Sequence, residues 1–139
     1  MSKEHTLAIL KPDTVAAGNV GNVIRVLEKS DLRIVAMRMI KLSLTEAKGF
    51  YAVHRKRPFF QSLCRFMSSG PVVVMVLEGK DAIDTWRNMM GPTNSEEAPK
   101  STVRGQFGTN IERNAVHGSD ATETAAEEIA YYFPGIDLI

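Results

Sequence analysis

The stretch that decides the fold is Pro71-Val72-Val73-Val74-Met75-Val76-Leu77, a nearly continuous apolar run in the middle of a 139-residue chain. Because neighbouring positions are all apolar, rather than every second one, the run predicts a central strand with both faces covered. It is far too short to cross a bilayer. Residues 6–10 predict a second, shorter strand, which ends at Lys11-Pro12-Asp13 because a proline cannot donate to a strand ladder.

Helical patterns lie between the predicted strands. In residues 19–29 the apolar side chains recur at the spacing of a helix that packs one face against a core. Ser43 and Glu46 have the spacing of a capping box, which opens another helix. The remaining helices are predicted from Pro58 to Met67, from a cap at Asp81 to about Met90, and from a cap at Ser119 or Asp120 to Pro134-Gly135.

Two more extended segments complete the predicted sheet. Residues 32–42 predict a long strand with one face partly exposed, and residues 115–118 a brief one, after a Gly- and Pro-containing segment, 91–114, of a kind that is usually functional. The order predicts an α+β, ferredoxin-like βαββαβ fold, a four-stranded antiparallel sheet with helices packed on it and a long active-site loop. Right-handed crossovers would place the helices on one face. Residues 1–139 would form a single domain.

The composition excludes some classes of protein. Hydrophobic residues make up 44% of the chain and the net charge is +1, which indicates neither a strongly basic nucleic-acid binder nor a membrane-surface segment. Cys64 is the only cysteine, so it is expected to be a small buried apolar residue rather than part of an intramolecular disulfide. Since no signal or transit peptide precedes the first strand, we expect a cytoplasmic setting.

Among the three histidines, His117 has the most suggestive position, between the long loop and a helix, with Gly118 leaving space beside it. His5 has no obvious partner, and His54 lies among basic residues that predict a solvated face. The sequence contains no phosphate-binding G-x-x-x-x-G-K-[ST] loop, no G-x-S-x-G elbow and no Cys or His pairs at metal-ligand spacing. If the protein is an enzyme, a histidine nucleophile is therefore one of few options left.

The segment Asn114-x-x-His117-Gly118-Ser119-Asp120 resembles the active-site signature of nucleoside diphosphate kinases. Further motifs follow in that family's order over essentially the whole chain, so that the likeness is highly specific. They are Leu10-Lys11-Pro12-Asp13, Phe50-Tyr51, Arg57-Pro58-Phe59-Phe60, Ser69-Gly70-Pro71, Leu77-Glu78-Gly79, Trp86-Arg87, Gly91-Pro92-Thr93-Asn94 and Thr102-Val103-Arg104-Gly105.

The resemblance implies a phosphotransferase that moves the γ-phosphoryl group of a nucleoside triphosphate, mainly ATP, to a nucleoside diphosphate. The transfer would be ping-pong through a phosphohistidine on His117, with low base specificity, and would maintain NTP and dNTP pools. Mg²⁺ would be carried by the nucleotide phosphates and not by protein side chains. The implied partners are ATP, ADP, GDP and other nucleotides, and further copies of the chain in a tetramer or hexamer, with no membrane and no specific nucleic acid.

The resemblance also implies roles for individual residues. Glu128 would orient His117, with Glu127 as the fallback, and Tyr51 and Ser119 would lie beside the histidine. Phe59 and Ile111 would enclose the base, while Lys11, Arg87, Thr93, Arg104 and Asn114 would contact phosphate or ribose. Taken singly, Lys11, Arg87 and Arg104 would be better explained as solvated surface charges. Thr93 could be a turn residue, Phe59 and Tyr51 could be packing residues, and a helix cap is an equally good interpretation of Ser119.

The chain departs from the family pattern at three places. Ser95 stands where the family usually has a proline, Lys100-Ser101 where it usually has Pro-Gly, and Val53 at a position that is acidic in many members. The first two put the stiffness of the long loop and the assembly state in question, because in the family this loop contributes to subunit contacts.

Two other interpretations compete with the phosphotransferase. One is an RNA-binding module, because sheets of this topology bind RNA and Arg104-Gly105-Gln106-Phe107 faintly resembles a conserved motif of such modules. The other is a pseudoenzyme that keeps the fold without the transfer, which the retained His117 and basic residues oppose.

Overall fold

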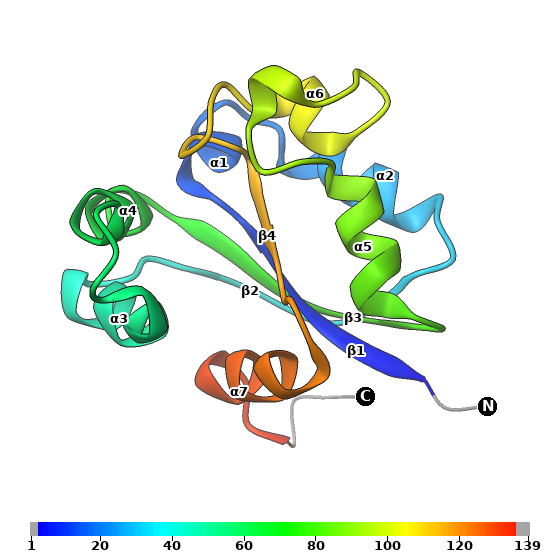
Figure 1. Cartoon of the computed structure of the whole chain (residues 1–139). Coiled ribbons are helices and arrows are strands. Elements are labelled where there is room, and N and C mark those ends of the chain that lie inside the picture. Colours follow the sequence, from blue (N-terminus) through cyan, green and yellow to red (C-terminus); the bar gives the residue numbers. More distant parts are fainter. Residues whose placement is uncertain (1–2, 136–139) are drawn as a thin grey trace.

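The computed structural model describes residues 3–135, and its centre is a four-stranded antiparallel sheet with strand order β2-β3-β1-β4 (Figure 1). This confirms the predicted α+β, ferredoxin-like βαββαβ fold. The strands are β1 (Glu4–Leu10), β2 (Arg33–Ile40), β3 (Val72–Gly79) and β4 (Val116–Gly118). The apolar run 71–77 forms most of β3, one of the two inner strands, as its composition predicts.

Helices cover both faces of the sheet, so the expectation that they share one face is wrong (Figure 1). The reason lies in β3, whose successive side chains point to opposite faces and are apolar on both. The helices are α1 (Pro12–Ala16), α2 (Val20–Glu28), α3 (Leu44–Phe50), α4 (Phe60–Met67), α5 (Ala82–Met90), α6 (Val103–Phe107) and α7 (Thr122–Tyr132), with short 3-10 turns η1 (Ala52–His54) and η2 (Ser95–Glu97).

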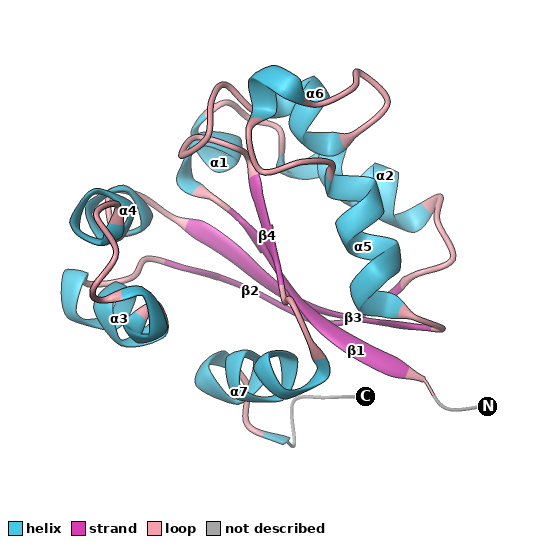
Figure 2. Ribbon diagram, in the orientation of Figure 1, coloured by secondary structure: helices cyan, strands magenta, loops and turns pink. Residues whose placement is uncertain are grey.

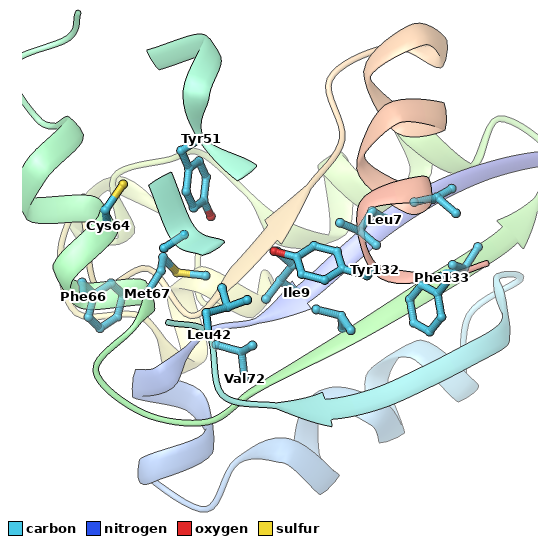
Figure 3. Close-up of a cluster of buried hydrophobic side chains, with 14 of the residues drawn as sticks. Leu7, Ile9, Leu42, Tyr51, Cys64, Phe66, Met67, Val72, Tyr132 and Phe133 are labelled. Atoms are coloured by element: carbon cyan, nitrogen blue, oxygen red, sulfur yellow. The ribbon is translucent and has the colours of Figure 1, made fainter. Parts of the chain in front are cut away.

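One core lies between the sheet and helices α3, α4 and α7 (Figure 3). Leu7 and Ile9 of β1 contribute to it from the sheet, and Tyr132 of α7 lies over them. Cys64 of α4 is fully buried in this core, which confirms its expected role as a small apolar residue. The other core lies on the opposite face, where α2 and α5 pack against the alternate residues of β1 and β3, with Trp86 as its largest fully buried side chain.

Local signals gave some helix starts and missed others. The capping box at Ser43 is confirmed, since its hydroxyl accepts from the Glu46 backbone N–H and the Glu46 carboxylate accepts from that of Ser43. The predicted cap of the last helix is wrong. Its N-cap is Ala121, whose backbone N–H donates to the hydroxyl of Thr124, while Ser119 turns inward to other partners.

The loop 91–114 crosses the end of the sheet next to α1 and contains η2 and α6 (Figure 2). Ser95 is buried against Gly108, where a Cβ would meet the Ser95 hydroxyl, so this departure from the family pattern is part of the loop's own packing. Lys100 and Ser101 are exposed. Because residues 103–107 are helical and Arg104 is buried, the RNA-binding interpretation of this segment is wrong, since that motif requires an exposed strand.

No helix among residues 3–135 has the length and apolar character that spanning a bilayer requires.

Candidate active site

A cavity of about 440 Å³ opens beside the end of the sheet where β4 and the loop 91–114 meet. Its size is that of a small-molecule site. The sequence-predicted site residues that line it are Lys11, Tyr51, Phe59, Arg87, Thr93, Arg104, Ile111, Asn114, His117 and Glu128. Ser119 does not line the cavity but contacts Glu128 from behind it. Residues from six or more separate segments of the chain therefore converge on one concave surface.

The backbone of His117 is held from several sides. His117 is the middle residue of β4 and pairs with Ile9 of β1, so the strand register fixes the position of its backbone along the sheet. The indole N–H of Trp86 donates to the His117 carbonyl over 3.1 Å. Gly118 must lack a side chain, because a Cβ there would lie 2.6 Å from atoms of both Trp86 and Met90. These contacts leave only the imidazole side chain directed into the cavity.

Glu128, eleven residues further along the chain, determines the orientation of that imidazole. Nε2 of His117 lies 2.9 Å from Oε1 of Glu128, and the Ser119 hydroxyl donates to the same oxygen over 2.8 Å. Burial alone would raise the pKa of Glu128, but the hydrogen bond and charge of His117, together with Ser119, lower it overall. Glu128 is therefore a carboxylate that can only accept, and Nδ1 is left as the ring nitrogen available for bond formation. The fallback residue, Glu127, is exposed.

Lys11 and Asn114 form a buried polar pair on the cavity wall. Lys11 Nζ donates to Asn114 Oδ1 over 2.7 Å, and the Asn114 amide donates to the backbone carbonyls of Thr93 and Ile111. Burial, and next the charge of Arg104, lower the pKa of Lys11 to about 8. The ammonium group of Lys11 is thus desolvated and has few neutralising partners, so it would attract an anionic ligand.

Arg104 is buried and binds the backbone with much of its guanidinium. Its donors reach the carbonyls of Asn114, Gly91 and Val116 at 3.3, 3.0 and 2.9 Å. Burial lowers its pKa to about 10, so it remains charged at neutral pH. Arg104 therefore ties the loop to β4, and a guanidinium has five N–H donors, which leaves some for a ligand.

Arg87 is the more exposed cation of the cavity and is paired with Asp120 at its mouth. Thr93 is exposed beside it on the loop. Deeper in, Phe50 and Tyr51 lie near the imidazole of His117, with ring centroids 5.5 and 6.3 Å away. Burial raises the pKa of Tyr51, so its hydroxyl stays protonated, and that hydroxyl has no hydrogen-bond partner within the described residues. Tyr51 therefore holds an unused hydroxyl donor, buried beside the His117 imidazole.

The rim of the cavity is apolar. Phe59 and Ile111 keep 42% and 63% of their surface exposed, although both line the cavity, and Val53 keeps 81%. Arg57 lies over the ring of Phe59 and the ring of His54 lies beside it. Exposed apolar side chains around a cavity favour a ligand with a flat apolar part. Nothing in the structure explains why Val53 replaces an acidic residue.

Sequence reasoning missed some residues and misjudged others. The basic residues 55–57 are exposed, as predicted for a solvated face, but His54 is half-buried and lines the cavity, which the sequence did not indicate. His5 is not without a partner, since its Nε2 lies 2.9 Å from Glu78. Asp120 lines the cavity and pairs with Arg87, whereas the sequence indicated it only as a motif residue and a possible helix cap. No local signal could have found these pairs, because their members are more than 30 residues apart or lie among misleading basic neighbours.

The chain is similar to known proteins over nearly its whole length. Residues 4–138 match the family model described as nucleoside diphosphate kinase. The chain is 58% identical to the nucleoside diphosphate kinase of Desulfosudis oleivorans over 136 residues, 98% of each protein. Among solved structures, it is similar to the enzyme of Aquifex aeolicus, with a TM-score of 0.97 and 45% identity over 99% of this chain and 100% of that one. The enzyme of Halobacterium salinarum in complex with CDP matches with a TM-score of 0.94 and 36% identity, over 99% and 92% of the two chains.

Proposed function

This chain belongs to the nucleoside diphosphate kinase family and is a nucleoside diphosphate kinase, and we propose that His117 is the residue that carries the phosphoryl group between nucleotides. The observation that carries this proposal is the bond between His117 Nε2 and Glu128, since it leaves Nδ1 free in a cavity with three cations. Retention of these groups argues against a pseudoenzyme.

In the first half-reaction, the lone pair of Nδ1 attacks the γ-phosphorus of a nucleoside triphosphate, mainly ATP. A phosphorus–nitrogen bond forms while the bond from phosphorus to the bridging oxygen breaks, and the diphosphate leaves with that electron pair. In the second half-reaction, a terminal oxygen of another nucleoside diphosphate attacks the phosphorus. A phosphorus–oxygen bond forms while the phosphorus–nitrogen bond breaks, and its electron pair returns to Nδ1. Because donor and acceptor use the cavity in turn, the mechanism is ping-pong and one nucleotide site suffices.

The cations supply the charge that this transfer needs. Phosphoryl transfer depends mainly on positioning and charge stabilisation. Lys11 offers a compact charge that burial has left under-solvated, while Arg87 and Arg104 offer planar N–H donors that match phosphate oxygens. Thr93 and Tyr51 would add hydroxyl donors, and Asn114 would contact the ribose or phosphate close to Lys11.

Phe59 and Ile111 would hold the base between apolar surfaces at the rim. Stacking contacts the face of a base and not the edge groups that distinguish one base from another, so base specificity would be low. The enzyme would then serve both NTP and dNTP pools. The Halobacterium salinarum relative was solved with CDP, a nucleotide other than an adenine one, which supports this expectation.

Mg²⁺ is proposed as the companion of the nucleotide. Within residues 3–135, no three His, Cys, Asp or Glu side chains lie so that they could hold a metal ion. The cavity carboxylates Glu128 and Asp120 are already engaged by His117 and Arg87. The phosphate oxygens themselves would therefore hold the ion, which would neutralise charge that the protein's cations leave over.

We also expect a homo-oligomer, a tetramer or hexamer, in the cytoplasm. The edge strand β2 exposes Met37 and Met39 by 52% and 60%, which favours contact with another copy of the chain. Light scattering measures the number of subunits.

The lone buried thiol of Cys64 is typical of a reducing setting.

The test of the proposed function is incubation with γ-labelled ATP and Mg²⁺. We expect acid-labile, alkali-stable label on the chain, close to one phosphoryl group per subunit, which a nucleoside diphosphate removes and which chelation of Mg²⁺ prevents. His117→Ala should abolish the label. His5→Ala is the matched control, because His5 pairs with Glu78 outside the cavity. Label that survives His117→Ala would disprove the assignment.

A further inference from the structure

Ala115, two residues before the nucleophile, has a backbone conformation that an alanine rarely adopts. Its φ is +73°, and only Asp81 shares a positive φ among the non-glycine residues in the range 3–135. The Val116 backbone N–H donates to the Asn114 carbonyl over 2.8 Å, two residues back. A two-residue hydrogen bond around a residue with φ near +75° defines the rare and strained form of γ-turn.

This γ-turn lies between two functional side chains. Asn114 comes immediately before the strained residue and binds Lys11 on the cavity wall, whereas His117 follows it on β4. The turn therefore determines how the imidazole lies relative to the residues that would bind the nucleotide. A strained backbone at such a place persists only when its surroundings hold it.

The direct hydrogen-bond partners of the Ala115 backbone all belong to one distant segment, residues 11–14. The Ala115 N–H donates to Asp13 Oδ2 over 3.0 Å. Its carbonyl accepts from the Thr14 hydroxyl over 2.8 Å and from the Lys11 backbone N–H over 2.9 Å. Both polar backbone groups of the strained residue are thus satisfied by the start of α1, and its methyl group is fully buried.

Asp13 acts at a distance from the ligand. It does not line the cavity, and its carboxylate is directed to the Ala115 backbone. Burial raises the pKa of Asp13, and the hydrogen bond from the Ala115 N–H and the charge of Lys11 offset only part of this rise. The charged carboxylate is therefore partly desolvated although it does not line the cavity. A partly buried carboxylate of this kind needs a role, and within residues 3–135 the only hydrogen bond that its side chain makes to a distant part of the chain is the one to Ala115.

We propose that Asp13 is a positioning residue for phosphoryl transfer, which together with Thr14 holds the strained γ-turn at Ala115 and so presents His117 to the nucleotide. This proposal rests on the proposed function in one respect, since it takes His117 as the nucleophile. It predicts that the contribution of Asp13 depends on the strain at residue 115. Glycine adopts a positive φ without steric cost. The hydrogen bonds from Asp13 and Thr14 to residue 115, which we call the clamp, should therefore contribute less to the rate when residue 115 is glycine.

The test is a double-mutant cycle that measures how fast label from γ-labelled ATP reaches the enzyme at saturating ATP. Asp13→Ala should slow phosphohistidine formation by about tenfold, the loss of one hydrogen bond to a charged acceptor. Asp13→Asn keeps an acceptor oxygen and should stay within about threefold of the parent. In an Ala115→Gly background, Asp13→Ala should cost less than about threefold.

Two outcomes would overturn the proposal. If Asp13→Asn is as slow as Asp13→Ala, the carboxylate acts through its charge on Lys11. If Asp13→Ala costs as much with glycine at position 115 as with alanine, strain is not what Asp13 resists. Should Asp13→Ala fail to fold, Thr14→Val removes the other clamping group with little change of shape, and its slowing must also shrink in the glycine background.

The same experiment separates this proposal from the proposed function. The final extent of labelling in the parent reports whether His117 is phosphorylated, whereas the rates report the clamp. A parent that never labels would remove the basis of both. A parent that labels fully, with an Asp13→Ala variant that labels equally fast, would refute the role of Asp13 alone.

Discussion

Oε1 of Glu128 lies 2.9 Å from Nε2 of His117 and, at the same time, accepts the hydroxyl hydrogen of Ser119. One carboxylate oxygen therefore organises two residues that flank Gly118 in the sequence. Since the carboxylate can only accept, the proton of the neutral imidazole resides on Nε2, and the lone pair resides on Nδ1. If His117 is the nucleophile, as proposed, this geometry favours Nδ1 as its reacting nitrogen.

Replacement of Glu128 by glutamine should slow phosphohistidine formation. The amide would weaken the hydrogen bond to His117 and remove the negative charge that favours the reacting tautomer, at a cost of about 1.5–3 kcal/mol, or roughly 10- to 150-fold in rate. Rapid-quench labelling measures this rate. Glu127→Gln, on the exposed side of the same helix, is the control and should keep the parent rate. Equal rates in both variants would contradict the orienting role.

Lys11 should impose an alkaline limit on activity. Its pKa is lowered to about 8, so the free enzyme loses this positive charge as the pH rises through that value. The ratio kcat/KM for ATP, which reports ionisations of the free enzyme, should fall above about pH 8. Lys11→Arg should move the fall to higher pH, because a guanidinium remains charged. If kcat/KM of the Lys11→Arg variant falls at the same pH as that of the parent, another group is responsible for the fall.

The same pKa predicts the opposite trend for stability. An unfolded chain holds the Lys11 proton up to a pKa of about 10.4. Between pH 8 and that value the unfolded state binds more protons than the folded state, so this group makes the free energy of unfolding increase with pH. Denaturant unfolding of the parent and of Lys11→Met at several pH values measures the effect. The increase attributable to Lys11 should be absent in the variant.

Arg104 and Arg87 should differ in their effect on stability. Arg104→Ala leaves three backbone carbonyls without their guanidinium partner, and each that stays buried and unpaired costs about 1–3 kcal/mol. Arg87→Ala breaks an ion pair whose side chains are 48% and 74% exposed, a contact worth about 0–1 kcal/mol. Both should slow transfer by tenfold or more, on the order of a lost charge-assisted bond. Calorimetry should find a clearly lowered Tm only for Arg104→Ala.

Gly118→Ala should damage the enzyme through packing. The added methyl would lie 2.6 Å from Trp86 and Met90, and overpacking of this kind costs about 1–3 kcal/mol. The Trp86 contact with the His117 carbonyl would shift with it, so activity should fall along with Tm. Gly21→Ala is the control, because a Cβ there meets nothing within 4 Å and the residue lies in helix α2. An unchanged Gly118→Ala variant would contradict the packing shown here.

Much of the fold was predictable because its signals are local. The apolar run of β3, the stripe of α2 and the capping box at Ser43 depend on residues a few positions apart. The start of α5 at Asp81 shows the limit of prediction from local signals. Asp81 occupies the N-cap position but makes no side-chain cap, and the carboxylate of Glu4 accepts from the Ile83 N–H instead. A cap supplied from 79 residues away leaves no local signal.

The sequence alone predicted many of the cavity residues, through its motifs and the resemblance that they carry, and the order of the strands and of most helices through apolar periodicity and capping. Only the tertiary structure decided that helices cover both faces of the sheet, that Arg104 binds three backbone carbonyls, that Ser119 supports Glu128 rather than capping α7, and that Asp13 holds Ala115. The physical reason is range. Periodicity and local capping boxes depend on residues a few positions apart, whereas hydrogen bonds to buried carbonyls and carboxylates join groups that only the folded chain brings within hydrogen-bond distance.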